Sequence, residues 1–306
     1  MKTTLFLLQT ALLVLIAPLI SGIIRKIKNN FRMRKGPGIF QPYYNLIKLF
    51  GKEEVISENT SWIFNFTPYI VLAAFACALL LVPGIFPGIA LNRVGDMFAL
   101  IFLFALARFF LALAGLDAGS SFGGMGSSRE MFISALTEPA FFVAAFAIGL
   151  GAGTTGLNIL SAGNSISLSR LAALGALFMV TIIETSRIPI DNQETHLELT
   201  MVHEAMLLEY SGRSLALLEL ASNLKQVILF SILSTVVLGV FSLEDFSPAS
   251  ILFFTALFLV KIILISIVIS VIEVTVAKMR LFRVPDFTAF AFVLSGAALV
   301  LAALGL

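Results

Sequence analysis

Six carboxylates and both histidines of this 306-residue chain fall within one segment, residues 184–213. The segment reads ETSRIPIDNQETHLELTMVHEAMLLEYSGR, and the sequence on either side of it is largely apolar. Carboxylates and imidazoles are the groups that hold and release protons, and buried acids often mark ion paths. We therefore expect this segment to lie where a membrane scaffold meets a soluble partner. Its acids are Glu184, Asp191, Glu194, Glu198, Glu204 and Glu209.

The same segment offers poor material for a metal site. His196 and His203 are seven residues apart, so they share one face if the segment is helical. However, the segment has no His-Glu-x-x-His arrangement, and the single cysteine, Cys77, lies in a distant apolar run. We predict no metal site and no catalytic residue in this chain. For the histidines we expect hydrogen bonding at a subunit boundary.

Six charges, Glu184 among them, interrupt or end apolar runs, three of them deep and three nearer one end: Arg108, Glu138 and Lys261, then Glu184, Lys225 and Glu273. A charge at the centre of a membrane helix costs about 2.5–3.5 kcal/mol, so these residues must be paired or hydrated. Three acids and three bases can balance one another. Two interpretations stay open, namely pairing that only joins helices and pairing along an ion path.

The elements that must position these residues are membrane helices. Hydrophobic residues make up 59% of the chain and charged residues 12%, against about 25% charged in soluble domains. The composition predicts an all-α polytopic membrane protein with a single membrane domain over residues 1–306. About eight transmembrane helices are expected, at 3–24, 63–85, 97–115, 130–151, 170–188, 217–241, 249–277 and 286–306.

The positive charges predict the orientation of these helices. Fourteen of the 20 Lys and Arg residues fall in the connections on one side of the bundle and three on the other. By the positive-inside rule, the large loops face the cytoplasm and both termini lie outside a cell (inner or plasma) membrane.

Two connections have unusual composition. Residues 41–54, QPYYNLIKLFGKEE, are too short to span but place their apolar side chains close to one helix face, which predicts an interfacial amphipathic helix. Residues 117–130 are rich in glycine and serine and lack the ending of a phosphate-binding loop. They form either a flexible connection or a loop that a partner's backbone approaches closely.

Two motifs resemble those of a known family. The segments RMRKGPGIFQPYYNLIKLFGKEE (32–54) and 184–213 are similar to the first cytoplasmic loop and the acidic loop of the subunit-1 family of respiratory complex I. His196 departs from that family, which usually has an acid there, and TMVHEAML before Glu209 is longer. Two segments, GLDAGSSFGGMGSSRE (115–130) and ETSRIPIDN (184–192), resemble the versions in group 4 membrane-bound nickel–iron hydrogenases, of the hydrogenase-4 and formate hydrogenlyase type.

The resemblance implies roles for individual residues. An acidic funnel beneath a docked redox subunit would be lined by Glu184, Asp191, Glu194, Glu198 and Glu209, with Glu138 further along. We add the charged residues of the apolar runs to this ion path: Arg108, Lys225, Lys261 and Glu273. Partner docking is expected of the basic and loop residues Arg32, Arg34, Lys35, Gln41, Pro42, Arg187, His196, His203, Arg280 and Arg283.

The resulting hypothesis is a non-catalytic membrane subunit of a hydrogenase-type oxidoreductase complex that couples electron transfer to proton or sodium translocation. The chain itself would bind no cofactor. The nickel–iron centre and iron–sulfur clusters belong to partners, which are the hydrogenase large and small subunits and a ferredoxin-like subunit, beside antiporter-like membrane subunits in the lipid bilayer. No nucleic acid is expected. The alternatives are a quinone-site subunit of complex I (NADH:quinone oxidoreductase) and an independent ion transporter.

Overall fold

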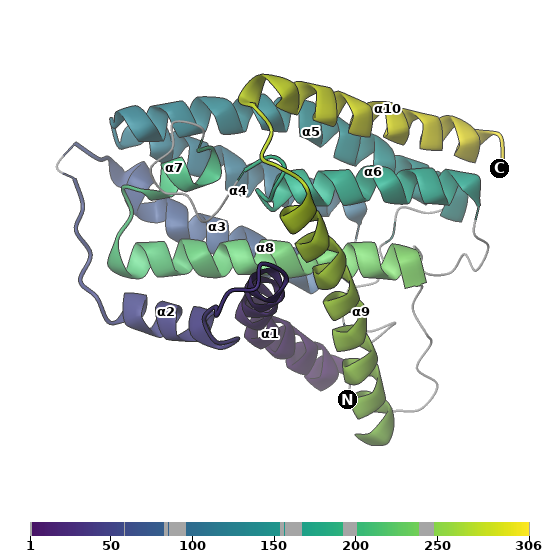
Figure 1. Ribbon diagram of the computed structural model, residues 1–306, viewed down its shortest axis with the longest axis horizontal. Helices are drawn as coiled ribbons and strands as arrows, with labels where there is room; N and C mark the ends of the chain where they lie inside the picture. The colour runs from purple at the N-terminus through teal and green to yellow at the C-terminus, as the bar shows by residue number, and fades with distance from the viewer. Residues whose placement is uncertain are drawn as a thin grey trace.

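The computed structural model describes residues 2–57, 59–82, 85, 96–153, 156, 167–191, 201–238 and 248–305. Most of the long helices lie roughly along the longest axis of the molecule, and others cross them (Figure 1). The helical elements in chain order are α1 (Lys2–Phe31), α2 (Gln41–Phe50), α3 (Trp62–Leu81), α4 (Met97–Asp117), α5 (Ser121–Ala152), α6 (Leu168–Glu184), α7 (His203–Leu207), α8 (Gly212–Leu238), α9 (Pro248–Thr275), η1 (Leu281–Arg283) and α10 (Val284–Ala303).

Each of the eight predicted spans is a helix. Within the described residues, seven helices are long and apolar enough to cross a membrane. The remaining one, α6, has 17 residues, which is the lower limit for a span. The prediction of an all-α membrane fold of about eight helices is therefore confirmed.

Side-chain caps explain several helix starts. The hydroxyls of Ser61, Ser120 and Ser167 accept hydrogen bonds from the first turns of α3, α5 and α6, and the carboxylate of Asp96 does the same for α4. Such caps satisfy backbone N–H groups that have no partner within the helix. The cap at Ser120 starts α5 nine residues before the predicted span at 130, so most of the glycine-rich connection is helical.

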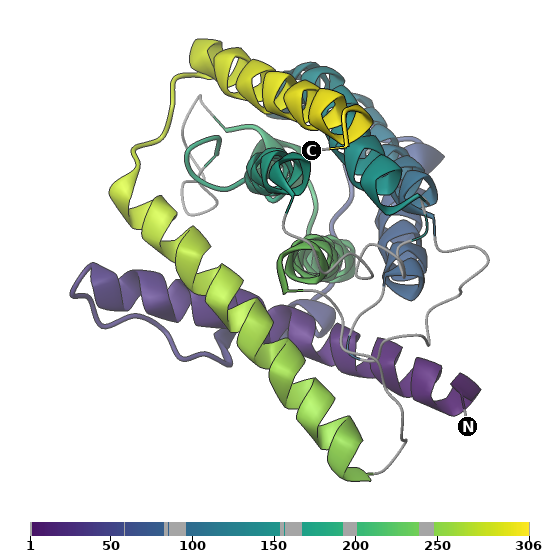
Figure 2. The same cartoon turned by 90° about the vertical axis from the view of Figure 1, so that its right-hand side faces the viewer.

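The helix α8 forms the centre of the bundle. In its most apolar window 72% of the residues are buried, against 22% in α9 and in α10. End-on, α6 and α8 lie in the middle, with α10 above them, α1 below and α9 crossing at one side (Figure 2). The helix α3 packs on α4 and α8, α10 packs along α5 and α6, and α2 lies against α8 and α1. Charged residues on α6 and α8 are therefore surrounded by other helices.

Candidate functional site

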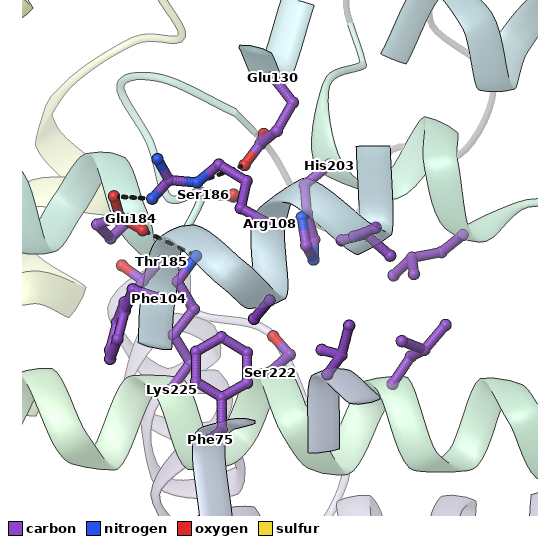
Figure 3. A pocket seen from close by; sticks show the side chains of 15 residues that line it. Phe75, Phe104, Arg108, Glu130, Glu184, Thr185, Ser186, His203, Ser222 and Lys225 are labelled. Carbon is purple, nitrogen blue, oxygen red and sulfur yellow. Dashed lines mark hydrogen bonds and ion pairs between the residues drawn. The ribbon is translucent and has the colours of Figure 1, made fainter. Parts of the chain in front are cut away.

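One arginine of α4 contacts acids of two other helices, α5 and α6. Arg108 of α4 is buried, and its Nη1 donates to Oε1 of Glu138 at 2.7 Å. Its Nη2 donates to Oε1 of Glu184, the last residue of α6 (Figure 3). Its Nε lies 3.8 Å from Oε1 of Glu130, and Oε2 of Glu184 lies 3.0 Å from Nζ of Lys225 on α8. We call these five residues the open cluster.

The spacing along α5 explains how two of these acids reach one arginine. Glu130 and Glu138 are eight residues apart, which places both on the same face of α5. Three carboxylates thus share the two cations Arg108 and Lys225. The side chain of Glu138 is 39% exposed, whereas that of Glu184 is 3% exposed. The open cluster therefore has an excess of acid and reaches the outside of the bundle at Glu138.

A second group of charges again uses the end of α6 and α8, and it adds residues of α1 and α9. Arg187, three residues after α6 ends, donates from Nη1 to Oε1 of Glu273 at 2.7 Å and from Nη2 to Oε1 of Gln226 at 2.8 Å. Nζ of Lys28 lies 3.2 Å from Oε2 of the same Glu273. Both carboxylate oxygens of Glu273 thus have a cationic partner. We call Lys28, Arg187, Gln226 and Glu273 the closed cluster.

Asp191 ties the segment after α6 to two others. Its Oδ1 lies 3.1 Å from Nζ of Lys278, and its Oδ2 accepts from the backbone N–H of Val202 at 3.0 Å and of His203 at 3.3 Å. The Met279 N–H also donates to the carbonyl of Pro189 at 2.8 Å. The buried Asp191 thus holds the start of α7 in place.

A cavity lies beside the open cluster. One wall carries Arg108, Glu130, Glu184 and Lys225, and the opposite wall is apolar, with side chains from α3, α4 and α8. His203 points into this cavity from α7, on the side that faces Ser222 (Figure 3). The space open to the centres of water molecules is about 30 Å³. This volume has room for one or two waters.

The Glu-Tyr-Ser-Gly sequence before α8 holds two distant segments in place. Tyr210 donates from its hydroxyl to the carbonyl of Phe64 at 3.0 Å and stacks on its ring, and burial raises the pKa of the Tyr210 phenol, which keeps it a donor. Ser211 exchanges hydrogen bonds with the backbone of Val55. Gly212 has φ +51°, and a Cβ there would lie 2.5 Å from the carbonyl oxygen of Glu53. The motif therefore clamps the segment before α3 onto the start of α8.

The glycine-rich start of α5 serves a contact within the chain. A Cβ on Gly126 would lie 2.9 Å from Cβ of Ala205 and 3.0 Å from the carbonyl oxygen of Val202. Arg129 also donates to the carbonyl of Met201 at 2.9 Å. Residues 121–130 are helical rather than a flexible connection, and the backbone that approaches Gly126 belongs to this chain's own segment at the start of α7 rather than to a partner.

The predicted ion-path residues lie in different parts of the structure. Arg108, Glu138, Glu184 and Lys225 come together in the open cluster, and Glu273 joins the closed one. Lys261 is buried on α9, about 18 Å from Glu273 along the helix axis. Glu209 lies half-buried at the turn between α7 and α8. Three predicted residues lie outside the described residues: Glu194, His196 and Glu198.

Three predicted docking residues, Arg187, His203 and Pro42, do not lie on an outer surface. Arg187 is buried because its guanidinium binds Glu273 and Gln226, and His203 is turned into the cavity because Asp191 holds its backbone. Arg34, Lys35, Arg280 and Arg283 are exposed, Arg32 and Gln41 are intermediate, and Pro42 is buried. No group of three or more His, Cys, Asp or Glu suited to a metal ion occurs within the described ranges.

Two site residues were missing from the predicted ion path. Glu130 is at the end of a segment that we expected to be a loop. If the helix is extended to include it, its spacing of eight residues from Glu138 indicates that both acids lie on one helix face. Lys28 stood beyond the predicted end of the first helix at 24, but α1 continues to Phe31 and turns this residue inward.

Comparisons with known proteins show the family to which the chain belongs. A family model described as NADH dehydrogenase matches residues 3–303. The chain is 33% identical over 253 residues to formate hydrogenlyase subunit 4 of Escherichia coli (strain K12), which covers 80% of this chain and 81% of that protein. It is 35% identical over 248 residues to hydrogenase-4 component C of the same organism, covering 80% and 78%.

A solved structure shares the fold. A chain of the membrane-bound sulfane sulfur reductase, an archaeal respiratory membrane complex, matches with a TM-score of 0.85 over 98% of this chain and 99% of that one, at 20% identity. The fold and the matches define a multi-pass membrane protein. The chain belongs to the NADH dehydrogenase family of complex I subunit 1-like proteins, and the resemblance seen in its motifs is confirmed.

Proposed function

We propose that this chain is the non-catalytic membrane subunit of a hydrogenase-type redox complex. In this proposal it docks a soluble module that carries a nickel–iron centre and iron–sulfur clusters, and it couples electron transfer there to proton or sodium translocation. The names of two relatives, a formate hydrogenlyase subunit and a hydrogenase-4 component, support the type of complex. The partners would be hydrogenase large and small subunits, a ferredoxin-like subunit and antiporter-like membrane subunits.

The observation that carries the coupling role is the open cluster itself. Burying several charges in a membrane bundle is expensive, and a cluster that only joined helices would be stabilised best by matched pairs. Here three carboxylates share two cations, and Glu138 is partly exposed at the outside of the bundle. Carboxylates in such an arrangement change protonation when a neighbouring charge changes.

The direction of docking follows from charge. We propose that the exposed Arg34, Lys35, Arg280 and Arg283 lie on the cytoplasmic face and contact the soluble module, with both termini on the other side. This orientation is supported by the distribution of Lys and Arg among the connections. The acidic segment after α6 would then stand between that module and the open cluster.

The class of complex is tested by what copurifies. A tag on this chain, followed by mild solubilisation and purification, is expected to recover nickel, iron and several subunits in fixed ratio. Recovery of flavin and a quinone-reductase activity would favour the complex I alternative. A chain that purifies alone and moves ions alone would contradict the proposal and favour an independent transporter.

The coupling role is tested with Glu138→Gln in the purified complex. Electron transfer by the soluble module should stay close to the wild-type rate, because in this proposal Glu138 serves the ion path and not the contact with that module. The ion gradient formed in proteoliposomes should fall. Asp286→Asn, which neutralises an exposed acid on α10, serves as the matched control and should form a normal gradient. A normal gradient with Glu138→Gln removes this residue from the path.

A further inference from the structure

Three buried polar atoms without hydrogen-bond partners belong to residues that line the same cavity. Within the part of the chain that the structure describes, they are Nε of Arg108, Oε2 of Glu184 and Nδ1 of His203. For Oε2 the contact at 3.0 Å with Lys225 is an ion pair. A buried polar group that forms no hydrogen bond costs about 1–3 kcal/mol. Nε of Arg108 and Nδ1 of His203 are two such atoms, and Oε2 of Glu184 can accept a second hydrogen bond beside that of Lys225. Together they point to a shared ligand in the cavity that hydrogen-bonds to them.

The chemistry of the three atoms restricts this ligand. Nε of Arg108 can only donate, Oε2 of ionised Glu184 can only accept, and Nδ1 of His203 can do either. A cation would be repelled by Arg108 and Lys225, and an anion by Glu184 and Glu130. Water both donates and accepts, and the space open to water centres, about 30 Å³, fits one or two molecules.

We propose that this cavity is a water-binding site in which one or two ordered waters bridge His203 to Arg108 and Glu184, and that His203 passes protons through them. The imidazole takes up a proton on one ring nitrogen and releases one from the other to the bridging water, so the ring ends neutral after each transfer. The transfer step rests on the proposed ion path; the water-binding step does not.

His203 is placed to connect the cavity with the acidic segment. Its backbone N–H is held by Asp191, and Figure 3 shows its ring pointing into the cavity. The next residue, Glu204, has its pKa raised by burial and by the nearby Asp191 and Glu219. The charged groups that line the cavity with His203 are Arg108 of α4, Glu130 of α5, Glu184 of α6 and Lys225 of α8. Glu204, the next residue in the chain, has His203, Asp191, Glu219 and Arg25 as its charged neighbours.

The water site can be observed directly because the chain has only two histidines. Histidine-labelled chain in lipid is studied by water-edited solid-state NMR, in which side chains that contact water gain magnetisation from it rapidly. His203→Asn assigns the two ring signals. The His203 signal is expected to build up as fast as that of a hydrated side chain. Slow build-up, typical of a dry core, would overturn the proposal.

A pair of substitutions at Ser222 controls for the cavity itself. Ser222→Leu fills the cavity and is expected to slow the build-up of the His203 signal severalfold, whereas Ser222→Ala leaves the space and should keep it fast. Thermal unfolding of both variants shows that each is folded, and Ser222→Val is a smaller replacement if the leucine variant is not. Equal build-up in the filling and the alanine variants would overturn the site.

The proton transfer is tested with His203→Asn in the complete complex. Asparagine can still hydrogen-bond to a water but cannot carry a proton, so ion translocation should fall severalfold while electron transfer persists. Unchanged translocation would overturn the transfer step. If the wild-type complex forms no gradient at all, the proposed function fails instead, and the NMR result still decides the water site.

Discussion

The open and closed clusters lie side by side on the same segments yet are built differently. Lys225 and Gln226 are neighbours on α8, and Glu184 and Arg187 are three residues apart, so each segment contributes to both clusters. In the closed cluster one carboxylate has a cation on each oxygen and its side chain is 4% exposed. In the open cluster Arg108 is shared by three carboxylates beside a cavity.

This difference indicates two uses for buried charge. Glu273 has a cation on each oxygen and is the single carboxylate of its cluster, so the closed cluster suits a structural joint between α1, α8, α9 and the segment after α6. In the open cluster Glu184 also has a cation on each oxygen, and Glu130 and Glu138 are additional acids on the same Arg108. Carboxylates that compete for one guanidinium can redistribute charge at low cost. The predicted assignment of Glu273 to the ion path is therefore replaced by a proposed structural role.

The largest effect on stability is expected for Glu273→Met. This change removes the carboxylate that pairs with both Lys28 and Arg187 and should cost about 3–5 kcal/mol. The loss is measured as the change in unfolding free energy of the purified chain in mixed micelles. Lys28→Met combined with Glu273→Met should recover part of the loss, because one of the two cations that lose the Glu273 carboxylate is gone. A loss of unfolding free energy below about 1 kcal/mol would mean that the closed cluster does not hold these helices together.

A smaller loss of unfolding free energy is expected for Gly212→Ala. This change tests whether the contacts of residues 210–212 with the segment before α3 hold the wall of the cavity in place. The alanine would adopt a positive φ and meet the Glu53 carbonyl, at a cost of about 1–3 kcal/mol. Gly124→Ala on α5 is the control, because a Cβ there meets nothing within 4 Å. If both variants unfold at the same temperature as the wild type, Gly212 does not constrain these contacts.

Glu130→Gln should change stability by less than about 1 kcal/mol, since it removes the excess negative charge of the open cluster and leaves one carboxylate for each cation. The unfolding free energy of this variant is compared with that of Glu273→Met under the same conditions. A loss as large as that of Glu273→Met would show that the open cluster is as tightly matched as the closed one.

The smallest effect is expected for Glu204→Gln. Burial and neighbouring acids raise the pKa of Glu204 in the folded chain, so its ionisation at higher pH opposes folding. The glutamine variant should thus gain thermal stability over the wild type at pH 8, and the gain should shrink as the pH is lowered and the wild-type carboxyl takes up a proton. Melting curves at several pH values test this; a gain that grows towards low pH would have the wrong sign.

The sequence predicted the helices better than the site. The apolar runs placed all eight long helices, because hydrocarbon length and backbone hydrogen bonding restrict membrane segments strongly. The start of α5 was wrong because glycine and serine were interpreted as a loop, whereas Ser120 caps the helix and Gly126 packs against α7. Pairing was not predictable, since Arg108 lies 30 residues from Glu138 and 76 from Glu184 in the chain.

The most direct test of an ion path through the open cluster is the number of ions moved per electron, measured in proteoliposomes that contain the complete complex. Two variants are compared with the wild type: Glu130→Gln in the open cluster and Lys28→Gln in the closed cluster. The ratio is predicted to fall in Glu130→Gln and to stay at the wild-type value in Lys28→Gln. An unchanged ratio in Glu130→Gln, or an equal fall in both variants, would contradict the division between the two clusters.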